Sequence, residues 1–393
     1  MFKLKKIWPV ILIAFLVVVF FWKFFLKDLL PIPADITVGM YFPWLDYKWG
    51  YTVGVPVKNP LISDVPSLVY PWRIFVIECF KKGILPLWNP YYFGGMPLLA
   101  NFQSAPFSLA NIFFVFLPAV YAWSAGVVIQ PFLSALFAYL YLRHLKIRKL
   151  AAFLGGTIFA FSGFSTVWLE YNVHGHTAMW LPILLLVTDK IIEEKRIKWI
   201  LLGSFVLAFQ IFAGYPQIVL YSLTAVVFYM FFRRSLSWRV ALFVLLGLLL
   251  ASVQLLPGLE ALQLSVRPID PIAKSSSEGF LPWRNLVTIL APDFFGNPAT
   301  VNFWGVPWYD NFALYTGVLP FLLAILAVFW RRDSLSRFFA FLLIFSLIIA
   351  LPTPIAKLVD KLGIYGMKAI PARIIFLLDF SMAILAALGL EQS

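Results

Sequence analysis

The chain has 393 residues, of which 62% are hydrophobic and only 12% are charged. An average soluble domain is about 45–50% apolar and about 25% charged, so this composition excludes a soluble globular protein. The formal net charge of +13 would suit a nucleic-acid partner in a soluble protein, but the basic residues here stand at the ends of apolar runs. We therefore expect no nucleic-acid partner. One cysteine excludes an internal disulfide, and three histidines leave little material for a structural zinc site.

The first 25 residues resemble a secretory signal peptide. Lys3, Lys5 and Lys6 precede a long apolar run, as in the positively charged start of such a peptide. No small-residue cleavage site follows, because residues 20–25 are almost entirely aromatic. We expect this segment to be a retained signal anchor.

Apolar runs near the length that crosses a bilayer recur along the chain. About 17–25 apolar residues are needed for one crossing. The sequence therefore predicts an all-α integral membrane protein with about ten transmembrane helices. The runs are 7–25, 120–142, 150–169, 177–192, 199–213, 218–232, 240–256, 312–330, 338–351 and 374–390.

The positions of the basic residues predict the orientation in the membrane. If the N-terminus is cytoplasmic, the short segments 143–149, 190–198, 233–239 and 331–337 all lie on the cytoplasmic side. With the N-terminal lysines they hold more than half of the 31 Lys and Arg. Cytoplasmic loops carry such an excess. We expect both ends to be cytoplasmic, and we interpret His144, within one of these basic segments, as part of a cytoplasmic anchor.

Two segments on the predicted outer side are too long to be simple connections. They cover 28–118 and 257–311 and are rich in Pro, Trp, Tyr and Gly. Ordinary connections have about 4–6 residues, and loops of this size are usually functional. We expect the functional site to lie in these loops, outside the cytoplasm.

No P-loop, GxGxxG, HExxH or GxSxG motif occurs, so the common nucleotide, dinucleotide, zinc-protease and hydrolase chemistries have no support. What remains is a set of carboxylates near a membrane surface. Asp35, Asp46 and Asp64 stand among aromatic residues and prolines of the first loop. Each is suited to act as a general base, a metal ligand or an ion-pair partner, with Arg73 nearby, or simply as a solvated residue or helix cap. The spacing does not choose between these roles.

A second polar group lies between two predicted spans. Glu170 and His174 are four residues apart and would share a face of a helix, and His174 with His176 forms a His-x-His pattern that binds metal when a third ligand arrives. The alternative is a cluster that bonds only to water and backbone.

Two further polar residues stand at or inside apolar runs. Gln217 follows the Gly214–Pro216 turn and is expected to point toward the outer leaflet. Asp379 lies six residues beyond Arg373, inside an otherwise apolar run. An intramembrane charge marks either a functional site or a buried structural pair.

Outer basic side chains are candidates for holding a phosphate, because guanidinium and ammonium groups bind phosphate oxygens. These candidates are Arg267, Lys274, Arg284 and Arg373.

A series of motifs at characteristic spacing runs through the chain. In the first loop they are SD at 63–64, YPWR at 70–73, PLWNPY at 86–91 and GGMPLLANFQSA at 94–105. Further along are SGF at 162–164, GYPQ at 214–217, NFALYTG at 311–317 and PAR at 371–373. The series resembles the YfhO family of bacterial membrane proteins over essentially the whole chain.

The resemblance implies a fold like that of GT-C glycosyltransferases and a function in the bacterial plasma membrane. Such an enzyme takes a sugar from a polyprenyl-phosphate carrier among the membrane lipids and places it on an envelope polymer or lipid outside the membrane. The position that matches the family's base is Asp64, with Asp35 and Asp46 as reserves. A divalent metal is an additional candidate, with no ligands assigned. The expected substrate-binding residues are Arg73, Asn89, Asn101, Gln103, Glu170, His174, Gln217 and Arg373.

Two departures from the family pattern affect this interpretation. Tyr215 stands where many relatives have histidine, and the chain stops at Ser393, whereas relatives usually continue into more spans and an outer domain. We therefore expect a fragment that lacks part of acceptor recognition. A transporter or flippase for a lipid-linked or polar solute is the main alternative, and a scaffold-like role is a third. A transporter would place paired broken helices and polar groups near the membrane midplane, so the long polar outer loops favour the transferase.

Overall fold

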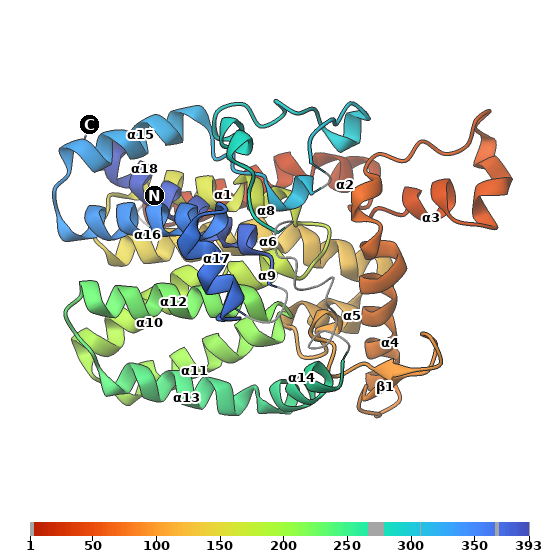
Figure 1. Ribbon diagram of the computed structural model, residues 1–393, viewed down its shortest axis with the longest axis horizontal. Coiled ribbons are helices and arrows are strands. Elements are labelled where there is room, and N and C mark those ends of the chain that lie inside the picture. Colours follow the sequence, from red (N-terminus) through yellow and green to blue (C-terminus); the bar gives the residue numbers. More distant parts are fainter. Residues whose placement is uncertain (1–3, 266–278, 307, 366–368, 393) are drawn as a thin grey trace.

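The computed structural model describes residues 4–265, 279–306, 308–365 and 369–392. Helices dominate these residues (Figure 1), as the all-α prediction requires. The described strands are β1 (Trp88–Asn89) and β2 (Met96–Pro97), which pair antiparallel with Trp88 opposite Pro97.

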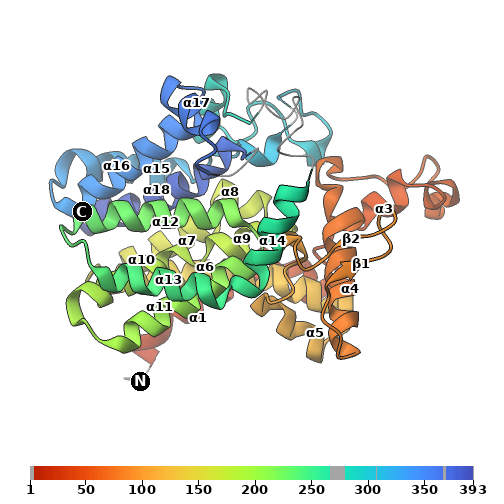
Figure 2. The same cartoon turned by 60° about the horizontal axis from the view of Figure 1, so that its bottom comes forward.

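The bundle is built from long helices that lie roughly along one axis, except that α14 bends away from α13 by 73° (Figure 2). They are α1 (Leu4–Phe20), α6 (Ala119–His144), α7 (Lys149–Ala160), α10 (Leu181–Glu194), α11 (Ile197–Phe212), α12 (Pro216–Phe232), α13 (Trp238–Leu250), α14 (Ser252–Leu264), α15 (Val318–Trp330), α16 (Ser334–Ala350) and α18 (Ile375–Gln392).

Shorter elements lie mostly at one end of the bundle. The α-helices among them are α2 (Trp22–Lys27), α3 (Asp35–Met40), α4 (Tyr70–Lys81), α5 (Phe113–Phe116), α8 (Gly163–Val167), α9 (His174–Ala178) and α17 (Pro354–Lys361). Single turns of other helix types are η1 (Trp44–Gly50), η2 (Pro60–Ile62), η3 (Val65–Val69), η4 (Phe102–Ser104), η5 (Leu109–Ile112), η7 (Trp283–Ile289), η8 (Pro298–Thr300), η9 (Tyr309–Asn311) and η10 (Pro371–Ile374).

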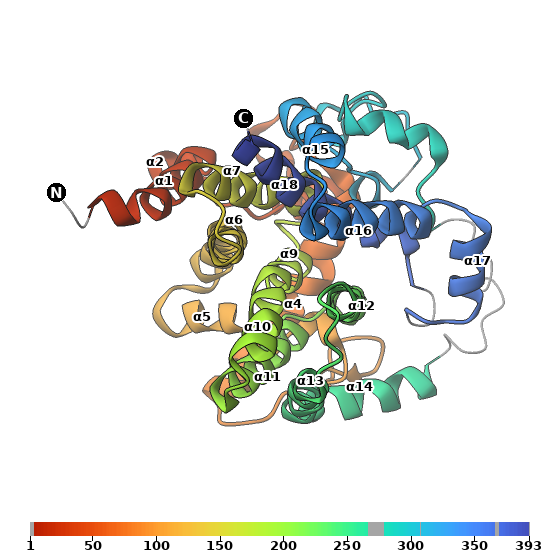
Figure 3. The same ribbon diagram turned by 90° about the vertical axis from the view of Figure 1, so that its left-hand side faces the viewer.

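Helix α18 forms the centre of one half of the bundle. It packs against α7, α15 and α16, and its residues from Ile375 to Leu388 are almost completely buried. The other half contains α10, α11, α12 and α13, and α6 links the halves through contacts with α7 and α10. Figure 3 looks along the helices and shows this arrangement. A helix that is apolar on all sides, like α18, is stable only when other helices or lipid surround it.

The number of membrane spans differs from the sequence prediction. Among the described residues, three helices are long and apolar enough to cross a membrane: Ala119–His144, His174–Glu194 and Pro371–Glu391. Two bent pairs, α13 with α14 at 73° and α16 with α17 at 72°, raise this number to five. Three to five candidate spans are fewer than the ten expected, so the sequence prediction of about ten spans was too high.

The correction has a local physical cause, because apolar content alone does not keep a segment helical. The run 150–169 breaks at Ser162, which is extended and whose hydroxyl accepts a hydrogen bond from the Ser165 N–H, capping α8. The run 312–330 becomes helical only after Gly317, whose φ of +106° suits glycine best. Both runs therefore yield helices of only 12 and 13 residues.

The first long segment folds as one unit beside the end of the bundle. Helix α4 and the β1–β2 pair stand next to each other there, and α3 and η1 project beyond them (Figure 2). Arg73 of α4 is fully buried and donates from Nη1 to Asn111 Oδ1 at 2.8 Å. The Asn111 amide in turn donates to the carbonyls of Ala105 and Pro106. These bonds tie α4 to the segment that leads into α5 and α6.

The opposite end of the bundle holds a buried ionic cluster. Asp189 of α10 has no exposed surface, and its carboxylate lies 2.8 Å from Arg233 Nε and 3.3 Å from His144 Nε2. The hydroxyl of Tyr229 donates to the same carboxylate at 2.7 Å. His144, Asp189 and Glu193 also offer atoms within 4.8 Å of one another, but Arg233 already contacts both carboxylates. His144 therefore joins α6 to α10, a role that the interpretation as an anchor did not include.

Candidate functional site

A cavity of about 310 Å³ lies where the long outer segments meet the bundle. We call it the Arg373 cavity. Its polar lining comes from Asp64, Gln103, Tyr171, Asp310 and Arg373, each from a different part of the chain. The remaining lining residues are Leu61, Trp168, His174, Tyr215, Trp308, Asn311 and Ile370.

Arg373 is the cation of this cavity. Its Nε donates to Asn311 Oδ1 at 2.9 Å, and its guanidinium carbon lies 5.1 Å from the ring centroid of Trp168 and 5.0 Å from that of Tyr215. Guanidinium groups are held well by aromatic faces. The two terminal nitrogens of Arg373 make no hydrogen bond to any described residue, so the planar fork remains able to bind an anion.

The aromatic wall beside Arg373 is a compact stack. The His174 ring lies 3.8 Å from Trp168 and 4.0 Å from Tyr215, measured between centroids. Both ring nitrogens of His174 are buried without a hydrogen-bond partner among the described residues. His174 therefore supports the two rings that hold Arg373.

Local sequence explains how these rings reach the cavity. Gly214 has φ +105°, and a Cβ there would lie 2.6 Å from the carbonyl oxygen of Phe102. Only glycine fits this turn, which places Tyr215 in the wall. Pro216 then starts α12, a position where its missing N–H costs nothing. The GYP sequence thus turns the chain and places the Tyr215 ring in the cavity wall.

Gln217 secures the segment that carries Arg373. Its Nε2 donates to the Ile370 carbonyl at 2.8 Å and to the Tyr221 hydroxyl at 2.9 Å, and its Oε1 accepts from the Ile370 N–H at 3.4 Å. Ile370 is the residue before η10. The expectation that Gln217 points toward the outer leaflet is wrong, because its amide is satisfied inside the protein.

Two carboxylates share the cavity with Arg373. Asp310 is half-buried, and burial raises the pKa of its carboxyl group to about 6. The backbone N–H groups of Asp310 and Asn311 stabilise the anion and oppose this rise, whereas the charge of Asp64 adds to it. Asp64 is exposed at the edge of the cavity. Burial raises the pKa of the Tyr171 hydroxyl, and the charges of Asp310 and Asp64 add to this rise. The hydroxyl therefore stays protonated.

This arrangement has a definite chemical capacity. A carboxylate with a pKa near 6 is able to accept a proton at neutral pH, and an open guanidinium fork is able to bind a phosphate. Asp64 and Asp310 are also the two carboxylates of the cavity suited to hold a divalent cation, although Arg373 already supplies a positive charge beside them. The cavity thus combines a carboxylate of raised pKa with a guanidinium whose terminal nitrogens are open.

Four residues singled out from the sequence meet in this cavity. They are Asp64, Gln103, His174 and Arg373. Gln217 joins them indirectly, through Ile370. Their separation along the chain exceeds 300 residues, so only the fold brings them together.

Three other acidic candidates lie elsewhere. Asp35 begins α3 and accepts a hydrogen bond from the Lys58 N–H at 2.8 Å. Asp46 is exposed in η1. Burial raises the pKa of Glu170 to about 7, and nearby Asp35 adds to this rise while Lys58 opposes it.

The structure does not bring Glu170 to His174. The residues between α8 and α9 form turns, with Asn172 at φ +57°, so the two side chains do not share a helical face. The Nε2 of His176 lies 2.9 Å from Asn172 Oδ1 and 3.0 Å from the Gly126 carbonyl. The expected His-x-His pair is therefore split between two environments.

The remaining amide candidates support loops. The Oδ1 of Asn89 accepts the Tyr91 N–H at 3.0 Å, and that of Asn101 accepts the Gln103 N–H at 3.2 Å. Arg73 is buried against Asn111 and does not line the cavity. In this structure these three residues stabilise the segment that places Gln103 in the cavity.

Among the other charged residues considered, Asp379 is fully buried and accepts a hydrogen bond from the Phe164 N–H at 3.1 Å. It fixes the start of α8 against α18. The guanidinium of Arg284 lies 5.6 Å from the Phe295 ring, outside the Arg373 cavity. Arg267 and Lys274 lie outside the described residues.

Sequence reasoning missed Asp310 as a catalytic candidate. It directly precedes the NFALYTG motif, which begins at Asn311. That adjacency was the available signal. Tyr171 and Trp308 carried no comparable signal, because single aromatic residues abound in this chain.

Comparison with known families settles the classification. The model of a family described as bacterial membrane protein YfhO matches residues 94–393. The chain belongs to this family. The match begins beyond Asp64 and contains the other charged residues of the cavity, Asp310 and Arg373. No curated protein matches the chain. Membership of the YfhO family confirms the resemblance and establishes a membrane protein.

Proposed function

We propose that this YfhO-family protein is a membrane glycosyltransferase that moves a sugar from a polyprenyl-phosphate carrier to an envelope polymer or lipid. The observation that carries the proposal is the Arg373 cavity, in which an open guanidinium faces the same space as Asp64 and Asp310. Sugar transfer from a phosphate requires both functions, a base for the acceptor and a cation for the leaving group.

The proposed step is a direct displacement. The acceptor hydroxyl oxygen bonds to the anomeric carbon of the sugar, and its proton passes to a carboxylate. The bond between that carbon and the phosphate oxygen breaks, and the electron pair leaves with the polyprenyl phosphate. Arg373 binds the phosphate oxygens through its terminal nitrogens and balances the charge that develops there.

We assign the base role to Asp310 first and treat Asp64 as its electrostatic partner. A base works best when its pKa lies near the working pH, and the pKa of Asp310 is about 6. The family resemblance favoured Asp64. Both carboxylates line the cavity, so substitutions of each are needed to divide the role.

The position of Arg373 suits a donor that is dissolved in the membrane. Arg373 lies in η10, directly before α18, and the apolar segment Pro371–Glu391 is one of the candidate spans. A phosphate bound there would lie at the membrane interface while its hydrocarbon tail stays in lipid. The basic residues Arg233 and Arg234 follow the far end of α12, away from Tyr215, which supports an outer location for the cavity.

A transporter or flippase is the second candidate, because the two bent helix pairs resemble the broken helices of transporters. In transporters the breaks themselves line the substrate site. Here the breaks at Ala251 and at 351–353 do not line the Arg373 cavity. This difference favours the transferase.

The proposal is tested with purified protein in lipid vesicles that contain radiolabelled polyprenyl-phosphate sugars and an envelope acceptor fraction. We expect label to pass to the acceptor with wild type and not with Arg373→Ala or with the double variant Asp64→Asn, Asp310→Asn. Movement of the intact labelled lipid across the bilayer without transfer would instead support the flippase.

A further inference from the structure

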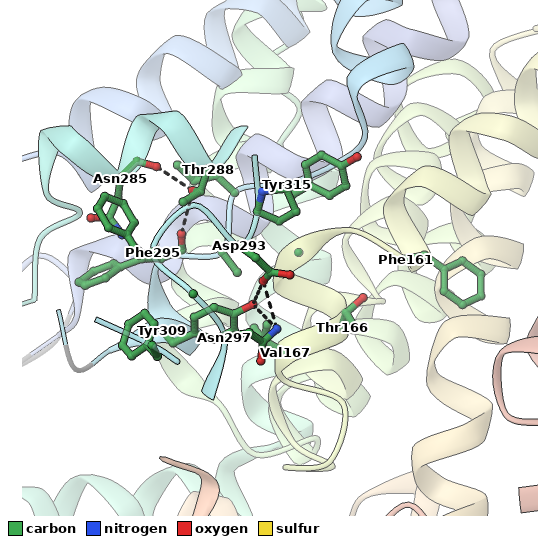
Figure 4. A pocket seen from close by; sticks show the side chains of 17 residues that line it. Phe161, Thr166, Val167, Asn285, Thr288, Asp293, Phe295, Asn297, Tyr309 and Tyr315 are labelled. Carbon is green, nitrogen blue, oxygen red and sulfur yellow. Dashed lines mark hydrogen bonds between the residues drawn. The ribbon is translucent and has the colours of Figure 1, made fainter. Parts of the chain in front are cut away.

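A second cavity of about 310 Å³ lies beside the Arg373 cavity. We call it the Asp293 cavity. Its polar lining comes from Asp293, Asn297, Tyr309, Asn285 and Thr166 (Figure 4). Its volume is at the lower end of the range for small-molecule sites, which have volumes of roughly 300–1,000 Å³.

Three side chains of this cavity form an ordered polar group. The Tyr309 hydroxyl donates to Asp293 Oδ1 at 3.2 Å, and Asn297 Nδ2 donates to the same oxygen at 3.1 Å. Figure 4 shows Asp293 and Asn297 facing each other in this way. The other oxygen of Asp293 makes no hydrogen bond to a described residue, so it is able to accept one from a ligand.

An independent feature points to a missing polar partner. Asn285 lines the cavity and is 7% exposed, and its Oδ1 has no hydrogen-bond partner among the described residues. A buried acceptor of this kind is costly unless a ligand or water satisfies it. The cavity thus has two acceptor oxygens without a hydrogen-bond partner among the described residues, a buried one on Asn285 and one on the exposed Asp293, and both suit hydroxyl donors.

The rest of the lining is aromatic and without positive charge. Phe295, Phe303, Phe312 and Tyr315 form much of the wall, and no Lys or Arg is among its described lining residues. Aromatic faces pack well against the C–H faces of a sugar ring. The guanidinium of Arg284 lies 5.6 Å from the Phe295 ring, but Arg284 is not among the residues that line the cavity. A phosphate inside the cavity would therefore meet the Asp293 carboxylate without a cation in the lining, which disfavours an anionic ligand.

The two cavities share one segment of chain. Trp308, Asp310 and Asn311 line the Arg373 cavity, whereas Tyr309 and Phe312 line the Asp293 cavity. The residues of 308–312 are therefore divided between the two cavities. Ligands in the two cavities would be held by neighbouring residues of the same turn, η9.

We propose that the Asp293 cavity is a subsite for a neutral sugar residue of the acceptor. The proposal rests on the function proposed above, because it assigns the phosphate-linked donor to the Arg373 cavity and an uncharged saccharide to the neighbouring one. The Asp293 carboxylate and the Asn285 carbonyl accept hydrogen bonds from the sugar hydroxyls, and the aromatic wall packs against its ring.

The test measures binding directly and does not depend on transfer. Purified protein in nanodiscs is titrated with the methyl glycosides of glucose, galactose and N-acetylglucosamine, followed by saturation-transfer-difference NMR. We expect saturable binding of at least one glycoside with Kd of about 1–10 mM, and weakening by about tenfold in Asp293→Asn, as for the loss of one charge-assisted hydrogen bond. Tyr309→Phe keeps the ring and should weaken binding less. The matched control Glu78→Gln, at an exposed carboxylate of α4, should bind like wild type.

Several outcomes would overturn the proposal. No saturable binding of any of the three glycosides would do so, and so would equal binding by wild type and Asp293→Asn. Tighter binding of glucose 1-phosphate, with dependence on Asp293, would also contradict a neutral subsite.

If Asp293-dependent sugar binding is found but no lipid-linked sugar is ever transferred, the subsite stands and the proposed function fails. If transfer occurs and Asp293→Asn leaves the acceptor KM unchanged, the subsite is wrong and the proposed function stands.

Discussion

Two carboxylates in one cavity differ in how well water reaches them. Asp64 is exposed, whereas Asp310 is half-buried beside Tyr171 and Asn311. Removal of a carboxylate from water disfavours its anion, and the charge of Asp64 adds to this effect at Asp310. At the residue scale, burial and a neighbouring charge therefore raise the proton affinity of Asp310, and this effect is measurable.

The first prediction concerns the pH dependence of transfer. With the pKa of Asp310 at about 6, the base is protonated in acid, so kcat/KM should be about tenfold lower at pH 5 than on the plateau above pH 7. Asp310→Asn should lower turnover by roughly 10²–10⁴ and abolish this acid limb. Asp64→Asn should move the limb to lower pH, because it removes the charge that raises the pKa of Asp310. Rates are measured between pH 5 and 9 with the radiolabelled donor.

Asp46→Asn serves as the matched control, since Asp46 is an exposed carboxylate of η1 outside both cavities. It should keep the profile of wild type. If Asp310→Asn retains both its rate and its acid limb while Asp64→Asn loses them, the base is Asp64, as the resemblance suggested.

The second prediction separates a phosphate-binding role of Arg373 from that of an interface anchor. Lysine keeps the charge and a long chain but lacks the planar fork that binds two oxygens and contacts Trp168 and Tyr215. Arg373→Lys should therefore weaken donor binding by about tenfold or more, measured by titration with a short-chain polyprenyl phosphate. A lysine variant that binds and turns over donor like wild type, with loss of protein only in Arg373→Ala, would identify an anchor.

At the element scale, the start of α12 and the turn η10 are held together across the bundle by one amide. Gln217 bonds both the carbonyl and the N–H of Ile370, three residues before Arg373. Backbone groups that lose such partners inside a protein cost about 1–3 kcal/mol each. The cavity geometry thus depends on a residue that does not itself line the cavity.

The third prediction follows from this contact. Gln217→Leu keeps the volume but removes both bonds to Ile370, so the donor KM should rise by about tenfold while the variant still folds, with a loss of stability of about 1–3 kcal/mol. Gln217→Glu still accepts the Ile370 N–H but no longer donates, and should lie between leucine and wild type. Steady-state kinetics and thermal unfolding provide the two readouts.

Thr224→Ala is the control on the same helix, because the Thr224 hydroxyl donates mainly to the carbonyl of Leu220 within α12. It should leave the donor KM unchanged. A Gln217→Leu variant with normal KM would show that Arg373 is placed without this amide.

At the scale of the whole molecule, composition predicted the fold class but not the number of long helices. The apolar runs become helices, yet several end early because local signals such as the Ser162 cap and Gly317 interrupt them. Apolar periodicity carries no information about such breaks when all faces are hydrophobic. The sequence therefore overestimated the number of helices able to cross the membrane.

The candidate site was predictable only in part for a similar reason. Asp64, Gln103 and Arg373 were found because they belong to motifs, and His174 was found by its spacing from Glu170 and His176. Such patterns indicate chemistry without showing which residues lie close together. Asp310 needed the fold, since its perturbed pKa arises from burial and from Asp64, far away in the sequence. The Asp293 cavity was not predicted, because Asp293, Asn297 and Asn285 belong to no motif, although Phe312 and Tyr315 of its wall lie in NFALYTG.

The final prediction concerns the orientation of the whole molecule in the membrane. The Arg373 cavity and the basic segment after α12 lie at opposite ends of that helix, since Tyr215 precedes it and Arg233 follows it. Basic segments favour the cytoplasmic side, so the cavity should face outward. Cysteines replace exposed residues in a Cys79→Ser background, which removes the only native thiol. Thr52→Cys and Ala299→Cys should react with an impermeant maleimide in intact spheroplasts, and Leu236→Cys should react only after permeabilisation. Reversed labelling would put the cavity in the cytoplasm, where nucleotide sugars are available, and would remove the main reason for a lipid-borne donor.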